Sequence, residues 1–280
     1  MSKTFANPFI LTMGEFASGG ADDFVAGISD PTERRLASAE LAYYRGNIAF
    51  AKNEFGELLD IQTELDEPDS ARGAGITLGY VLASLACGDV ETVKNSLEFA
   101  QLMKEESRAV EFFEIYLNIL IQNFRAINFP PVGITSFDGL ESVRPMAFFA
   151  YSLYLIETDS RERAVGMAES ALIFMKKPCP IATIQLCLNI SVGYMLMRVW
   201  DKAEYYFRLA WEYAEPDGII MPFAERRTAL SGMLERCLRF ERPESYKKIS
   251  ALAKDYNSAV IAVHNAVTGD SIPDCLTQIE

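Results

Sequence analysis

Histidine is nearly absent from this 280-residue chain, which has only His264. Nucleophilic catalysis by a Ser–His–Asp or Cys–His arrangement would have to use that one residue. The five cysteines form no CxxC pair, and no glycine cluster has the GxxxxGK[ST] pattern of a phosphate-binding loop. We therefore expect no enzyme, no catalytic residues, no metal site and no cofactor.

Positive charge and long hydrophobic runs are also scarce. The formal net charge is −13 and the pI is about 4.7, so the chain is a poor binder of nucleic acid or anionic lipid by itself. The longest apolar runs, Met146–Ile156 and Ile115–Ile121, are too short to cross a bilayer, and the N-terminus lacks a clear signal-peptide core. We expect a cytoplasmic protein without membrane contact.

The cysteine pattern also favours a cytoplasmic location. Each lies in or beside an apolar helical stretch, which predicts reduced, buried thiols in a reducing compartment. The residues concerned are Cys87, Cys179, Cys187, Cys237 and Cys275.

Helical periodicity, interrupted at regular intervals, is the main signal that is present, and alternating runs typical of strands are absent. A helix is expected from Pro31 to Arg45, where Gly46-Asn47 ends it. The pattern returns and breaks at Gly88-Asp89, then at residues 158–160, and again near Trp200-Asp201. We predict an all-α chain, a right-handed α-solenoid of tetratricopeptide-like hairpins with a period of about 40 residues.

Three segments follow from this pattern. Residues 1–30 are expected to cap the stack or to form a dimer contact, because solenoid ends expose an apolar face. Residues 31–268 are the repeat domain, with a loop at 127–142, where Pro130-Pro131 prevents a continuous helix. Residues 269–280 are expected to be a linker. The remaining helices are expected at residues 106–126, 223–240 and 244–266.

Aromatic residues at helical spacing allow two interpretations. Tyr43, Tyr44 and Tyr194 suit a helix core, but a tyrosine projecting into the groove of a solenoid could stack on a ligand or peptide. His264 lies beside an apolar helical face, where a structural, hydrogen-bonded histidine is favoured over a catalytic base.

The segment from Pro216 to Glu225 is the most unusual. Pro216-Asp217-Gly218 is a turn signature, and Pro222 suits the first turn of a helix. The simpler interpretation is a tight, buried connection between helices. In the alternative, the polar pair Glu225 and Arg226 faces the groove and contacts a ligand.

Several segments resemble the helical-repeat region of LuxR-type transcriptional regulators of the large, MalT-like kind. They are Ala39–Asn47, Ala168–Leu172, Ala210–Glu225, and Val263–Asn265 followed by Thr268-Gly269. Leu276-Thr277-Gln278-Ile279-Glu280 resembles the Leu-Thr-x-x-Glu motif that begins the helix-turn-helix domain of this family. The basic recognition helix and the preceding nucleotide-binding domain have no counterpart in these 280 residues.

The resemblance implies a module that receives a signal by binding a small inducer or a regulatory protein in its concave groove. DNA would be bound only through a C-terminal domain that this chain lacks. The alternative is a free-standing tetratricopeptide-like scaffold for protein–protein interaction, and a third hypothesis is an enzyme that uses His264. The candidate ligand- or partner-binding residues are Tyr43, Tyr44, Tyr194, Glu225, Arg226 and His264.

Overall fold

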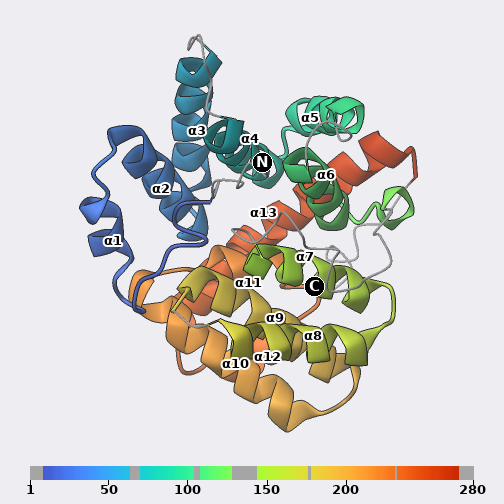
Figure 1. The fold of residues 1–280 in the computed structure, drawn as a ribbon. Helices are drawn as coiled ribbons and strands as arrows, with labels where there is room; N and C mark the ends of the chain where they lie inside the picture. Colours follow the sequence, from blue (N-terminus) through green and yellow to red (C-terminus); the bar gives the residue numbers. More distant parts are fainter. Residues whose placement is uncertain are drawn as a thin grey trace. The chain divides into compact units, whose positions relative to one another are not determined.

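The regular secondary structure is all helical in the part of the chain that a computed structural model describes, and no strand occurs there (Figure 1). The described residues are 9–63, 70–103, 108–127, 144–175, 178–230 and 232–270. The expected all-α class is confirmed for these residues. They divide into two compact units. Unit 1 contains residues 48–144 and 254–270, and unit 2 contains residues 9–47 and 145–253.

In unit 1, successive helices pack on one another, α3 on α4, α4 on α5 and α5 on α6. These helices are α3 (Ile48–Thr63), α4 (Ser70–Ala86), α5 (Val90–Met103) and α6 (Arg108–Leu120), followed by the 3-10 turn η1 (Phe124–Ala126). Gly79 of α4 faces the ring of Phe55 of α3 so closely that an added Cβ would lie 2.3 Å from Cε1. The small residue therefore sets how closely the two helices approach.

Unit 2 is built around α9, which packs against both α8 and α10. Its helices are α1 (Ala21–Gly27), α2 (Pro31–Tyr44), α7 (Arg144–Glu157), α8 (Arg161–Phe174), α9 (Pro180–Leu196), α10 (Trp200–Ala214), η4 (Glu215–Asp217), α11 (Met221–Glu225) and α12 (Met233–Leu238). Every residue of α9 from Pro180 to Met195 is buried. Helix α13 (Pro243–Thr268) begins in unit 2 and ends in unit 1.

Five helices end in the same type of turn. In the first, Asn47 N–H donates to Ala42 O (2.8 Å) and Gly46 N–H to Tyr43 O (2.9 Å), the paired bonds that close a helix with one left-handed residue. The left-handed residues, with φ from +59° to +80°, are Gly46, Gly88, Gln122, Asp159 and Arg198. Successive turns are 34 to 42 residues apart. The expected breaks at 46–47, 88–89 and 158–160 coincide with three of these turns.

Two predicted helices differ from the structure. Residues 223–240 do not form one helix, because α11 ends at Glu225 and α12 begins only after Gly232, whose φ is +81°. The helix expected at 106–126 ends at Leu120, and a turn at Gln122 follows. The helix expected at 244–266 is confirmed by α13. Most of the loop predicted at 127–142, and residues 271–280 of the linker, lie outside the described residues.

Three of the cysteines are buried as expected, but Cys87 is exposed, so its predicted burial is wrong. Burial raises the pKa of Cys179 to about 11 and that of Cys187 to about 12, which keeps both thiols protonated at neutral pH. Cys275 lies outside the described residues. None of the described helices has the length and hydropathy that crossing a membrane requires.

A close approach of α9 to α8 gives a first prediction. A Cβ on Gly193 would lie 2.4 Å from Val165 Cγ2, so Gly193→Ala should destabilise the protein by about 1–3 kcal/mol through overpacking. The matched control is Gly166→Ala in α8, where nothing lies within 4 Å of the new Cβ. It should be neutral or stabilise by up to about 1 kcal/mol, because alanine is the better helix former. Urea unfolding compares the two, and equal effects would contradict the prediction.

Candidate functional site: a buried arginine cluster in unit 2

The short helix α11 is positioned by the turn that precedes it. Gly218 adopts φ +68° after η4, so the chain reverses, and the N–H of Ile220 then donates to Tyr44 O (2.8 Å). Pro222 lies in the first turn of α11, where its missing N–H costs nothing. The turn thus packs α11 against α2 and α9. The side chains of both Glu225 and Arg226 are buried there.

Glu225 and Arg226 form a buried ion pair, with side chains only 5% and 4% exposed and 3.4 Å between Oε2 and Nη1. Tyr43 of α2 donates its hydroxyl to Glu225 Oε1 (2.6 Å). Arg226 Nε donates to Asn189 Oδ1 of α9 (3.0 Å), and the guanidinium carbon lies 4.6 Å from the centre of the Phe149 ring of α7. The Glu225 carboxyl also accepts a hydrogen bond from the side chain of Gln185 of α9. We call Tyr43, Gln185, Asn189, Glu225 and Arg226 the arginine cluster.

A second set of contacts orients the cluster. Asn189 Nδ2 donates to Ser152 Oγ (2.8 Å) and to the carbonyl of Phe149 (3.0 Å), which leaves its Oδ1 to accept from Arg226. Burial raises the pKa of the Glu225 carboxyl, while the charge of Arg226 and hydrogen bonds from Tyr43 and Gln185 oppose that rise. A buried charge is tolerated only when it is paired in this way.

Two buried polar atoms of the cluster lack a hydrogen-bond partner among the described protein atoms. They are Arg226 Nη2, a donor, and Gln185 Oε1, an acceptor. Leaving such an atom unsatisfied costs about 1–3 kcal/mol, so each calls for a hydrogen-bonding group from water or a ligand.

Tyr44, a further predicted site residue, belongs to a neighbouring polar group on α2. Its hydroxyl lies 2.8 Å from Thr12 Oγ1, and Thr12 Oγ1 also donates to Glu40 Oε2 (2.8 Å). The rings of Tyr43 and Tyr44 meet edge to face, with centroids 5.6 Å apart. The tyrosine pair thus joins this group to the arginine cluster.

Tyr194 lies in a different polar group, on α8, α9 and α10. Its hydroxyl donates to Glu169 Oε1 (2.7 Å), and the Tyr206 hydroxyl donates to the same oxygen (3.0 Å). The two rings stack with centroids 6.0 Å apart, and Lys202 Nζ lies 4.8 Å from the centre of the Tyr194 ring. Tyr194 is 7% exposed, so its ring belongs mainly to the core.

His264 lies in unit 1 and is 6% exposed. Its Nδ1 is 2.8 Å from the carbonyl oxygen of Ile121, the residue that follows the end of α6. Because a carbonyl can only accept, Nδ1 carries the proton and donates. The bond satisfies a carbonyl at the end of a helix, the structural role that the sequence favoured for this residue.

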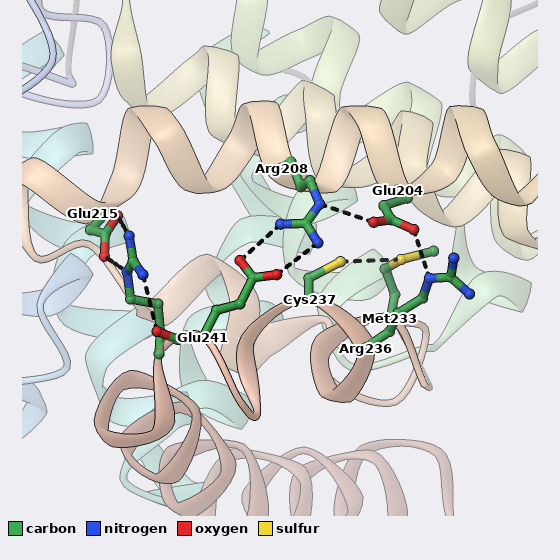
Figure 2. Close-up of polar contacts among 8 residues, drawn as sticks. Glu204, Arg208, Glu215, Met233, Arg236, Cys237 and Glu241 are labelled. Atoms are coloured by element: carbon green, nitrogen blue, oxygen red, sulfur yellow. Dashed lines mark hydrogen bonds and ion pairs between the residues drawn. The ribbon is translucent and has the colours of Figure 1, made fainter.

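Ion pairs connect α12 and Glu241, which follow the arginine cluster in the sequence, to α10. Figure 2 shows Arg208 of α10 between Glu204, to which Nε donates (3.0 Å), and Glu241, which it contacts through two nitrogens (3.0 and 3.1 Å). Glu204 also accepts from Arg236 of α12 (2.6 Å). These arginines lower the pKa of Glu204, and Arg208 lowers that of Glu241. The network ties α12 to α10.

Sequence reasoning brought Tyr43, Glu225 and Arg226 into the candidate set, and the structure places these three in one cluster. The sequence pattern alone had not indicated Gln185, Asn189 or Glu40. A signal for Gln185 and Asn189 exists in the sequence, because they are four residues apart in a largely apolar helix and so lie on one face.

No family model matches the sequence, and no curated protein and no solved structure matches it either. Within the described ranges, no group of three or more histidine, cysteine or acidic side chains is arranged to hold a metal ion.

The buried ion pair gives a second prediction. Arg226→Met leaves the Glu225 carboxylate buried without a counter-charge and should cost about 3–5 kcal/mol of unfolding free energy. The double variant Glu225→Gln/Arg226→Met should recover part of this loss, because the remaining side chain is neutral. The control is Arg236→Met, because the Arg236 side chain is 64% exposed and its pair with Glu204 should contribute less than about 1 kcal/mol. A loss no larger than that of the control would contradict burial of the pair.

The Glu40 carboxyl gives a third prediction. Burial raises its pKa from 4.5 to about 7, although hydrogen bonds from Thr12 and Ile10 oppose the rise. The folded state therefore holds this proton more tightly than the unfolded chain. Its contribution to stability is complete below pH 4.5 and is lost as the pH rises through about 7.

We expect the unfolding free energy of the wild type, relative to that of Glu40→Gln, to fall between pH 4.5 and 7. Groups that titrate in both proteins contribute equally to the two unfolding free energies and cancel in the difference. Glu40→Gln itself should cost about 1–3 kcal/mol at pH 7, because an amide offers one acceptor oxygen where two main-chain N–H groups bind. Urea unfolding at several pH values measures both effects, and parallel curves would refute the assignment to Glu40.

Proposed function

We propose that the chain is the signal-receiving helical-repeat module of a LuxR-type transcription regulator, and that it binds a small inducer or a regulatory protein. The observation that carries the proposal is the arginine cluster. It lies where the Ala210–Glu225 segment, one of those that resemble the family, meets α2 and α9. Its two atoms without protein partners, Arg226 Nη2 and Gln185 Oε1, are the groups offered to the ligand.

The repeat architecture in this proposal is a right-handed α-solenoid of tetratricopeptide-like hairpins. The five equivalent turns, spaced by 34 to 42 residues, support it. In such a stack each hairpin buries its apolar face against its neighbours, and the concave side is available for binding. The module acts in the cytoplasm, is not an enzyme, and would reach DNA only through a helix-turn-helix domain, which these 280 residues do not include.

A fourth prediction tests whether the arginine cluster receives a ligand. Fractions of an extract of small molecules from the source cells are screened for a rise in the unfolding temperature of the wild type. A ligand at a hundred times its Kd stabilises by about 2.7 kcal/mol, a shift of a few degrees. Gln185→Met should abolish the shift, because it removes the buried acceptor.

The matched control is Gln62→Met in unit 1, another buried glutamine with a side-chain atom that lacks a partner among the described residues. It should respond to the fraction as the wild type does, and mass spectrometry of that fraction then identifies the compound. The ligand role of the cluster fails if no fraction shifts the wild type, or if both variants respond equally.

The alternative is a free-standing scaffold that binds a protein in its groove. The two functions differ in what the gene encodes after residue 280. A helix-turn-helix with a basic recognition helix supports the regulator, whereas a stop codon together with one reproducible partner in a pull-down supports the scaffold.

A further inference from the structure

Residues 9–13, which we call the strap, lie over a buried carboxyl group of α2. The N–H of Ile10 donates to Glu40 Oε1 (2.9 Å), and the N–H and the hydroxyl of Thr12 both donate to Oε2 (2.8 Å each). Glu40 is 7% exposed and Thr12 is 2% exposed. The strap therefore keeps water away from this carboxyl group, and opening the strap hydrates it.

The groups around Glu40 do not supply it with a counter-charge. Its hydrogen-bond partners are uncharged, and each arginine that neighbouring elements bring to this part of α2 already has a carboxylate partner. The titratable and charged groups on α1, η4, α11, the start of α9, α2 itself and the segment after the strap are Asp22 paired with Arg45, Asp217, Glu225 paired with Arg226, Cys179, Tyr44 and Glu15. Burial is thus the largest influence on the pKa of Glu40 and raises it to about 7. Ionisation of the carboxyl weakens the closed arrangement.

The residues that follow the strap have contacts of their own. Phe16 is buried, and its ring centre lies 5.1 Å from that of Phe24 of α1. Ser18 Oγ donates to the carbonyl of Tyr213 of α10 (3.1 Å). None of these three contacts involves Glu40, so the strap can open while the residues after it stay in place.

A buried thiol lies beneath the strap. Cys179, which precedes the first turn of α9, donates to the carbonyl of Thr12 (3.5 Å) and is 5% exposed. Cys187 lies about two turns further along α9 and is fully buried. The two thiols together distinguish opening of the strap from unfolding of unit 2.

We propose that the strap is a pH-responsive cover, which stays closed while the Glu40 carboxyl is protonated and opens when that carboxyl ionises. In the open form the carboxylate is hydrated, and Phe9, Leu11 and Cys179 become accessible to solvent. The pKa of the carboxyl is about 7 in the closed form and returns to 4.5 in the open form, so the open population rises about tenfold per pH unit between these values. This device needs no ligand at the arginine cluster.

Alkylation of Cys179 in the full-length protein tests the proposal. Wild type and Glu40→Gln are treated with N-ethylmaleimide at several pH values, and peptide mass spectrometry gives the rate at each cysteine. Ionisation of the thiol speeds the reaction equally in both proteins, so the ratio of the Cys179 rates, wild type over variant, reports the strap. We expect this ratio to rise about a hundredfold from pH 4.5 to 7. A ratio that does not change with pH would overturn the proposal.

Cys187 is the internal control. In the wild type at pH 7 it should react at least about tenfold more slowly than Cys179, because reaching it requires more than opening of the strap. Equal rates at the two cysteines would show that unit 2 unfolds as a whole, and the proposal would then be wrong.

Hydrogen exchange of the wild type decides the matter if Glu40→Gln does not fold. After correction for the pH dependence of intrinsic exchange, the protection of the amides of residues 9–13 should fall about a hundredfold from pH 4.5 to 7. It should also remain below the protection of α9. Protection that is constant with pH, or equal to that of α9, refutes the strap.

Discussion

The burial of one guanidinium group constrains much of unit 2. Arg226 is 4% exposed, and a buried charge without partners would cost several kcal/mol. Its partners are the adjacent Glu225 and Asn189 of α9. Glu225 in turn accepts from Tyr43 of α2. Because each donor must meet an acceptor at hydrogen-bond distance, the pair fixes the mutual positions of α2, α9 and α11.

Acidic side chains have a similar role at the N-terminal segment. The chain carries 39 aspartates and glutamates, and two of them, Glu40 and Asp217, are buried and each accept two main-chain N–H groups of residues 10–21. A carboxylate is suited to this because its two oxygens bind two donors at once. Tyr43 and Tyr44, neighbours on α2, join the contacts of Glu40 to the arginine cluster.

The proposed signal reception depends on these polar contacts rather than on the helices themselves. A stack of helical hairpins has no chemistry of its own, and its function lies in the side chains that it presents. In unit 2 the notable polar contacts are the arginine cluster, whose donor and acceptor lack protein partners among the described residues, and those of Glu40 with Ile10 and Thr12.

The all-α class, the helix starts at Pro31 and Pro243, and the turns at Gly46 and Gly88 followed from the sequence by itself, because periodicity, proline and glycine act locally. Gln122 and Arg198 adopt the same left-handed conformation without being turn formers, so packing of the flanking helices decided them. Tyr43 and the polar pair of Glu225 and Arg226 were predicted as candidates on separate grounds. Only the tertiary structure brought them together, because a hydrogen bond between residues 182 positions apart depends on how α2 and α11 pack, which no local pattern encodes. For the same reason Glu40, an ordinary helical glutamate by sequence, became the buried acceptor of the N-terminal segment.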